Sequence, residues 1–369
     1  TFRVSAVNRN NIPSLTPLAS TSTLAGAVTN LPDPFFAVFE TSAAVAWGSL
    51  PESPPALSSH SAEGYALYAS STNFGAAAGG GVISSSLTAG VTQSTLTVTG
   101  LERNTTYYFR VGALNWNGAA NFTITGATST RAQPPAGMQA FSMFETSAAV
   151  NWIALAASPQ AVSAEGYVLE ASSTAFGALA PDGVTYSSRT TNITLSTLTV
   201  SGLETNTTYY FRAGTLDWSG RATYGVGAAS ATLAAPPDAP AYALIHVTSV
   251  TVSWTAVASS GYELQASVNP TFTPVFFTST TAAGATSLRV AGLTADTTYH
   301  FRVGSINRHS IRNYAGVGST STLTVPPTTP SLTAGGVFFT SATVQWAAVT
   351  SQGYLLEAST ASNFSGDVW

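Results

Sequence analysis

The sequence contains no cysteine and no lysine, although it is 369 residues long. The lack of cysteine excludes thiol catalysis and thiolate metal sites. It fits either redox compartment, because units of roughly 100 residues can bury a sufficient core without disulfides. All twelve basic residues are arginine, and the net charge is −4. Proteins that bind nucleic acid carry a basic stripe, so this charge balance argues against a nucleic-acid partner.

Long apolar runs are also missing. No stretch of about eighteen or more apolar residues occurs, so the sequence predicts no transmembrane helix and no membrane insertion. Thr1 does not begin a signal peptide. Only 8% of the residues are charged, but 44% are hydrophobic, and this composition argues against a disordered chain.

Three sequence signals recur in a fixed order along the chain, which indicates a tandem repeat. The first is an alternating segment that ends in Trp47, Trp152, Trp254 and Trp346, as in TSAAVAW. The second is a Gly-Tyr segment that begins at Gly64, Gly166, Gly261 and Gly353, as in GYVLEAS. The third is the motif NTTYYFRVG from Asn104, with the variants NTTYYFRAG from Asn206 and DTTYHFRVG from Asp296.

All three signals have a period of two residues, which is typical of half-buried β-strands and not of helices. The successive Trp residues lie 105, 102 and 92 positions apart. Pro-rich segments separate the units: LPDP from Leu31, QPP from Gln133, APPDAP from Ala235 and VPPTTP from Val325. Short strands in units of this length predict an all-β protein made of antiparallel sandwiches.

The order of Trp, Gly-Tyr and then GLxxNTTYYFRVG resembles the fibronectin type III domain over nearly the whole chain. The resemblance implies tandem seven-stranded sandwiches, with sheet A-B-E packed on sheet C-F-G, in an elongated array. It implies that Trp47, Trp152, Trp254 and Trp346 are the core residues of strand B. It also implies that Tyr107, Tyr209 and Tyr299 are tyrosine-corner residues, whose hydroxyl groups bond to the backbone of the preceding loop.

The same alignment divides the chain into five parts. Three complete domains are expected at residues 27–132, 133–235 and 236–326. Residues 1–26 are expected to supply strands F and G of a truncated domain, and residues 327–369 strands A to C of another. We expect either that the chain is a stretch of a longer array or that a neighbouring chain completes these sheets.

No catalytic, metal-binding or cofactor-binding residue is predicted, so we do not expect an enzyme. An active site needs convergent polar groups that are placed once. The four His residues fall in different units or on different predicted elements, and the acidic residues mostly recur in register: Glu40 with Glu145, for example, and Glu63 with Glu165. Recurrence in every unit is typical of scaffold positions.

Trp116 and Trp218 are the candidate contact residues, because both fall in the predicted F–G loop, in LNWNG and LDWSG. Arg308 stands at the matching place in the next unit. An exposed Trp can stack on a sugar or anchor a protein partner. Alternatively, each Trp packs on a neighbouring domain or on its own sheet. The first two units also have longer B–C loops, which makes them the better candidates for a contact surface.

Five Asn-X-Ser/Thr triplets are candidate N-glycosylation sites: Asn104, Asn121, Asn192, Asn206 and Asn363. The resemblance places Asn104 and Asn206 at the E–F corner, which the family exposes.

A structural role is the preferred function. Exposed sheet edges are usually protected by charge, especially by Lys, so a chain without Lys is expected to be covered by other copies or by glycans. We therefore expect a self-associating segment of an extracellular or cell-surface filament or stalk. One alternative is an adhesin or receptor ectodomain that binds glycan or protein through its B–C and F–G loops. A second alternative is the spacer array of a secreted carbohydrate-active enzyme.

Overall fold

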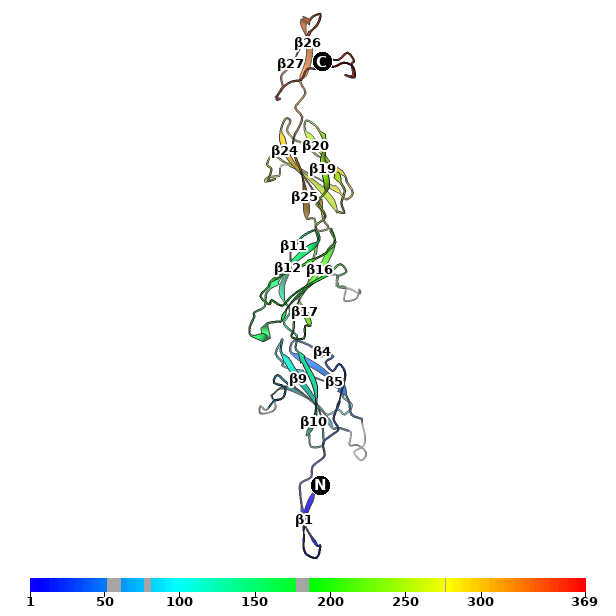
Figure 1. The fold of residues 1–369 in the computed structure, drawn as a ribbon, viewed down its shortest axis with the longest axis vertical. Coiled ribbons are helices and arrows are strands. Elements are labelled where there is room, and N and C mark those ends of the chain that lie inside the picture. Colours follow the sequence, from blue (N-terminus) through cyan, green and yellow to red (C-terminus); the bar gives the residue numbers. More distant parts are fainter. Residues whose placement is uncertain (52–60, 76–80, 177–185, 276) are drawn as a thin grey trace. The chain divides into compact units, whose positions relative to one another are not determined.

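The computed structural model describes residues 1–51, 61–75, 81–176, 186–275 and 277–369 (Figure 1). The regular structure of these residues consists of β-strands and a single-turn 3-10 helix at Gln160–Val162. The contacts within the chain divide it into two units. The first comprises Thr1–Ser142, Ala149–Val200 and Tyr210–Ala229, and the second comprises Met143–Ala148, Ser201–Tyr209 and Ser230–Trp369.

The first sandwich has two antiparallel sheets. Its first sheet consists of β3 (Thr29–Asn30), β4 (Ala37–Val38), β5 (Ser42–Gly48) and β8 (Thr95–Thr99), and β5 pairs with each of the other three. Its second sheet has the order β10-β9-β6-β7, formed by β6 (Gly64–Ser70), β7 (Val82–Thr88), β9 (Thr106–Leu114) and β10 (Ala120–Ser129).

The second sandwich repeats this plan. One sheet has the order β11-β12-β15, formed by β11 (Ala136–Met143), β12 (Ser147–Ile153) and β15 (Thr197–Ser201). The other has the order β14-β13-β16-β17, with β18 also paired to β16. Its strands are β13 (Gly166–Ser172), β14 (Tyr186–Thr190), β16 (Thr208–Leu216), β17 (Ala222–Tyr224) and β18 (Ala228–Ala231).

The third sandwich has the sheets β19-β20-β23 and β22-β21-β24-β25. Its strands are β19 (Asp238–Ile245), β20 (Ser249–Thr255), β21 (Gly261–Ser267), β22 (Phe277–Ala282), β23 (Ser287–Ala291), β24 (Thr298–Ile306) and β25 (Arg312–Ser321). In family letters, the two sheets are A-B-E and C′-C-F-G. The expected fold class, tandem seven-stranded antiparallel sandwiches, is confirmed by this strand pairing.

An aromatic pair lies at the centre of each sandwich. Trp47, Trp152 and Trp254 are 1%, 4% and 5% exposed. Each packs on the tyrosine of the Gly-Tyr segment, namely Tyr65, Tyr167 and Tyr262, with ring centroids 5.2, 5.0 and 5.0 Å apart. Because the Trp lies on strand B and the Tyr on strand C, each pair joins the two sheets.

The tyrosine of the Gly-Tyr segment also makes hydrogen bonds with its hydroxyl group. The backbone N–H of Leu50 donates to the Tyr65 hydroxyl at 2.7 Å, and that hydroxyl donates to the carbonyl of Val91 at 2.9 Å. The hydroxyl of Tyr167 likewise accepts from the N–H of Leu155 and donates to the carbonyl of Ile193. The hydroxyl of Tyr262 accepts from the N–H of Val257 and donates to the carbonyl of the same residue. The phenol therefore ties down the loop that leaves strand B, and burial raises the pKa of Tyr65 and Tyr167.

The glycine of the same segment is required by a close approach of the neighbouring strand. A Cβ atom at Gly64 would lie 2.0 Å from the carbonyl oxygen of Thr88, and at Gly166 it would lie 2.1 Å from that of Thr190. Any larger residue at these two positions would push the C′ strand away.

The recurring nine-residue motif forms a corner and strand F. The backbone N–H of Glu102 donates to the hydroxyl of Tyr107 at 3.0 Å. The corresponding bonds from Glu204 to Tyr209 and from Thr294 to Tyr299 are both 3.1 Å. All three tyrosines are at most 3% exposed.

The terminal segments form two separate hairpins. β1 (Arg3–Val7) pairs with β2 (Pro13–Pro17), and β26 (Thr328–Val337) pairs with β27 (Ala342–Ala347). The strand expected from Gly353 is wrong, because residues 353–358 form no strand. In the three sandwiches this segment lies between strands C′ and F, and residues 327–369 offer neither neighbour. Trp346 contacts the ring of Tyr354 but is only half-buried, unlike the other strand B tryptophans.

Replacing Tyr209 by Phe tests the corner bond. Tyr209→Phe removes the hydroxyl that accepts from Glu204, so we expect the second sandwich to lose about 1 kcal/mol of stability. Hydrogen exchange of peptides from residues 133–235 measures the change. The adjacent Tyr210 is 40% exposed, so Tyr210→Phe is the matched control. Equal protection in both variants would show that the corner bond contributes nothing.

Candidate contact surfaces at the joints between sandwiches

The F–G loop of each unit begins with a short polar residue that folds the loop. Asn115, Asp217 and Asn307 occupy this position, directly after strands β9, β16 and β24. The side-chain Oδ1 of each accepts hydrogen bonds from two backbone N–H groups of its own loop, at 2.8–3.0 Å. Asn and Asp favour such turns because the short side chain reaches the backbone two residues on.

The same side chain joins the loop to the preceding unit. The Nδ2 group of Asn307, which is 1% exposed, donates to the carbonyls of Ala231 and Thr232 at 3.2 and 2.9 Å. Asn115 donates to the equivalent carbonyls of Ser22 and Thr23 at 3.4 and 2.9 Å. Each of these joints lies within one of the two compact parts into which the contacts divide the chain.

The joint between the first and second sandwiches is also formed by side-chain donors, but the residues differ. Asp217 has no N–H to donate, and Arg221, four residues on, takes over this role. Its Nη2 group donates to the hydroxyl of Thr128 at 2.7 Å and to the carbonyl of Ser129 at 2.8 Å. The Arg221 Nε atom lies 3.5 Å from Oδ2 of Asp217, whose side chain is fully buried. This distance gives an ion pair but not a hydrogen bond, and the guanidinium compensates the buried carboxylate.

Further polar bonds reinforce the joints. Asn121 donates to the carbonyl of Ala25 at 2.8 Å, and Asn313 donates to that of Ala234 at 3.0 Å. The hydroxyl of Ser305 donates to the carbonyl of Ala235 at 2.6 Å. That of Thr215 donates at 2.7 Å to the carbonyl of Gln133, in the segment that leads into its own sandwich. The contacts between sandwiches are thus formed largely by side chains of one unit and backbone carbonyls of the unit before it.

The two loop tryptophans project into solvent. Trp116 is 68% exposed and Trp218 is 56% exposed. Their rings therefore do not pack closely on a neighbouring sandwich or on their own sheet, which was one of the two sequence-based alternatives. Arg308 is also exposed, but it belongs to a joint, because its backbone N–H and its Nε donate to Oδ1 and the carbonyl of Asn206 at 3.0 and 3.1 Å.

Of the two long B–C loops, the second is described in full. Residues 52–60 of the first loop lie outside the described residues. In the second loop, Gln160 Nε2 donates to the carbonyl of Asn104 at 3.0 Å, and Glu165 Oε1 accepts from Asn104 Nδ2 at 3.1 Å. This loop therefore contacts the E–F corner of the first sandwich.

These contacts correct the expectation for Asn104 as a glycosylation site. The side chain of Asn104 is fully buried, and its Nδ2 atom is bonded to Glu165. The corner is covered because the next sandwich packs on it. Asn206 and Asn121 are half-buried at joints, whereas Asn192 and Asn363 are exposed. Their Oδ1 atoms accept from Thr194 and Ser365, respectively.

An arginine stacked between rings was missed by the sequence analysis. The guanidinium carbon of Arg212 lies 4.2 and 4.0 Å from the ring centres of Phe176 and Tyr224. Arg302 lies at 4.2 and 4.1 Å from Phe272 and Tyr314, and Arg110 at 4.2 and 4.1 Å from Phe74 and Phe122. The signal was the constant Arg in TYYFR and TYHFR, which has no role in the corner itself.

Carboxylates lie beside two of these stacks. Glu170 pairs with the stacked arginine itself, whereas Nε of the stacked Arg302 donates to Oε1 of Gln265. Glu170 lies 2.7 Å from Nε of Arg212, and Glu263 lies 3.1 Å from Arg312 and accepts from the hydroxyl of Tyr314. Burial, followed by the hydrogen bond to the glutamate, raises the pKa of Tyr224 and Tyr314 to about 12. Both phenols are therefore neutral structural groups at physiological pH.

Within the described ranges, no three His, Asp or Glu side chains gather as metal ligands. No helix among the described residues is long and apolar enough to cross a membrane.

No protein-family model matches the sequence, and no curated protein matches it. Solved structures that are similar to the chain include the following two. The chicken CNTN1 FN1-FN3 domains are 16% identical, with a TM-score of 0.29, and the alignment covers 78% of this chain and 96% of that one. A two fibronectin type III domain segment from chicken tenascin is 16% identical, with a TM-score of 0.32. Its alignment covers 52% of this chain and 100% of that one. Because both scores are below 0.5, the fold assignment depends on the strand pairing. The sandwiches are fibronectin type III-like.

Proposed function

We propose that the chain is a structural segment of an extracellular or cell-surface filament or stalk built from tandem fibronectin type III-like repeats. The observation that carries this proposal is the polar joint, which recurs at three successive places along the chain. A chain of independent binding modules needs only flexible linkers. Bonds such as those from Asn307 to Ala231 and Thr232 instead restrict the movement of one sandwich on the next, as a stalk requires.

The joint between the second and third sandwiches is tested by replacing its Asn307 amide with the Asp–Arg arrangement of the preceding joint. In Asn307→Asp, the carboxylate keeps the Oδ1 bonds within its own loop but loses both bonds to the preceding sandwich. Because a buried acceptor then faces two carbonyls, we expect the joint to weaken by about 1–3 kcal/mol. The double variant Asn307→Asp with Ile311→Arg reproduces the Asp217–Arg221 arrangement and should restore the joint.

Spin-label distances between exposed positions of the second and third sandwiches provide the measurement. The chain has no cysteine, so Thr197→Cys and Thr280→Cys can be labelled without background. We expect a broader distance distribution for Asn307→Asp and the parent width for the double variant. Identical distributions in all three proteins would contradict the proposed stiffening role.

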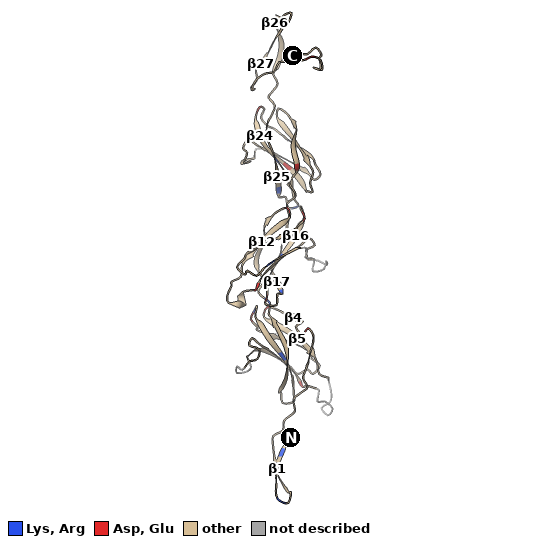
Figure 2. Ribbon diagram, in the orientation of Figure 1, with Lys and Arg blue, Asp and Glu red and all other residues tan. Residues whose placement is uncertain are grey.

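The proposed segment associates with other copies of itself. Charged side chains are sparse along the ribbon (Figure 2). The outer strands β7, β10 and β22 carry no charged residue, so their edges lack the usual protection against pairing with another sheet. On β7, Ile83 and Leu87 are 55% and 65% exposed.

Sedimentation velocity at increasing concentration tests this association. We expect species larger than the 37.8 kDa chain and a clear reduction of these species in Leu87→Lys, because the added charge lies on the open edge. Thr92→Lys adds the same charge in a turn of the same sandwich and should have little effect. A single monomeric species at every concentration would contradict self-association.

The exposure of Trp116 and Trp218 favours a second candidate, an adhesin or receptor ectodomain that binds glycan through its F–G loops. Indole rings that are more than half exposed can stack on sugars. This function and a stalk are compatible in one chain.

An array of neutral and acidic oligosaccharides tests the second candidate. We expect the intact chain to bind, and the double variant Trp116→Ala with Trp218→Ala to lose at least about tenfold in affinity while its folding is unchanged. Phe141 is 65% exposed on β11, and Phe141→Ala is the control for loss of an exposed ring. Unchanged binding in the double Trp variant would eliminate this candidate.

A further inference from the structure

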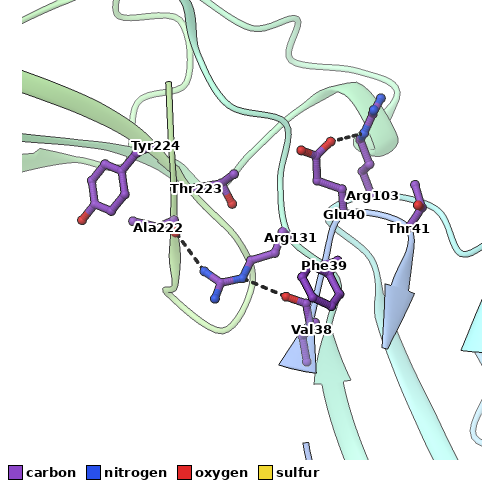
Figure 3. Close-up of a pocket in the computed structure, with 9 residues that line it drawn as sticks. All are labelled: Val38, Phe39, Glu40, Thr41, Arg103, Arg131, Ala222, Thr223 and Tyr224. Atoms are coloured by element: carbon purple, nitrogen blue, oxygen red, sulfur yellow. Dashed lines mark hydrogen bonds and ion pairs between the residues drawn. The ribbon is translucent and has the colours of Figure 1, made fainter. Parts of the chain in front are cut away.

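A pocket of about 560 Å³ lies where the first sandwich meets the second, within one unit of the chain (Figure 3). Phe39, Glu40 and Thr41 form one wall, from the segment between β4 and β5. Arg103 and Arg131 come from the E–F corner and the end of strand G, and Ala222–Tyr224 of β17 form the opposite wall. The volume is within the range that holds a small ligand.

The pocket carries an excess of positive charge. Arg131 donates from Nε to the carbonyl of Val38 at 3.2 Å and from Nη1 to that of Ala222 at 2.8 Å. Both acceptors are neutral, so the charge of Arg131 is held in place but not compensated. Arg103 pairs with Glu40 at 2.7 Å, and Figure 3 shows this pair beside Arg131. The ionic groups that line the pocket therefore sum to one positive charge.

At the equivalent place in the joint between the second and third sandwiches, both arginines are replaced by uncharged residues. Thr205 and Leu233 stand there in place of Arg103 and Arg131. Asn313, which corresponds to Thr223, donates at 3.0 Å to Glu145, the counterpart of Glu40, so the carboxylate at this joint has a partner. Thr223 is too short for this bond, and its Oγ1 atom is buried without a hydrogen-bond partner. The two guanidinium groups and the unsatisfied hydroxyl thus occur together only at the first of these two joints.

The lining defines the ligand by three requirements. The uncompensated guanidinium favours one carboxylate, since arginine matches its planar geometry. Glu40 can accept hydrogen bonds from hydroxyl groups, and it repels ligands with more negative charge, such as phosphates. Phe39 is 59% exposed and presents a ring face, on which the apolar face of a sugar can stack.

We propose that this pocket binds a saccharide with a single carboxylate, of the uronic acid class. The carboxylate accepts from Arg131 and Arg103, a sugar hydroxyl donates to Glu40, and the ring lies against Phe39. This site is separate from the exposed tryptophans of the F–G loops and does not depend on them.

Titration of the whole chain with D-glucuronate, followed by NMR amide shifts, tests the site. We expect saturable shifts for residues 38–41 and 222–224, and at least about tenfold weaker binding of D-glucose, which lacks the carboxylate. Arg103→Thr and Arg131→Leu introduce the residues of the second joint, and each should weaken glucuronate binding at least about tenfold.

Two controls keep the test decisive. Arg308→Ala removes one positive charge at the joint between the second and third sandwiches and should leave glucuronate binding unchanged. Circular dichroism verifies that each variant is folded. Because Arg131→Leu also removes one bond across the joint, to Ala222, and one bond within the first sandwich, to Val38, Arg103→Thr is the primary variant. The proposal is overturned by unaltered binding in Arg103→Thr, by equal affinity for glucose or sulfate, or by no saturation up to about 100 mM glucuronate.

Discussion

The contact between a buried indole and a buried phenol is the interaction on which each sandwich depends. The Trp of strand B and the Tyr of strand C come from opposite sheets, so their contact fixes how the sheets pack. The phenol hydroxyl then satisfies a backbone N–H of the loop that follows strand B, as between Tyr65 and Leu50. A buried polar group without a partner would be costly, so the same ring closes the core and orders the loop.

The joints follow a different physical principle from the cores. They are built from side-chain donors and backbone carbonyls. An Asn amide or the arginine of an Asp–Arg pair donates to the carbonyl at one equivalent position, Ala231 in one joint and Ser129 in another. Backbone carbonyls are present whatever the sequence, so a joint of this kind tolerates change on one side as long as the other side supplies donors. This is well suited to a tandem array, in which units diverge while each must still fit its neighbour.

The sequence predicted the strands and the core residues of each sandwich, but it missed the stacked arginines and the contacts between neighbouring sandwiches. Period-two alternation was sufficient to place the strands, and the resemblance identified Trp152 and Tyr209, which the structure buries. Asn104 was expected at an exposed corner, but Gln160 and Glu165 of the next sandwich cover it. Contacts between residues so distant in the sequence leave no periodic signal. The segment from Gly353 has the sequence pattern of a strand, but it forms none because no neighbouring strand pairs with it.

The stacked arginines have a consequence for how the chain is degraded. Without lysine, a trypsin-like protease has only the twelve arginines as cleavage points. Arg110, Arg212 and Arg302 lie within strands and are held between aromatic rings, so their peptide bonds cannot enter a protease cleft while the sandwich is intact. The folded cores should therefore survive in protease-rich surroundings, with cleavage directed to exposed arginines such as Arg308.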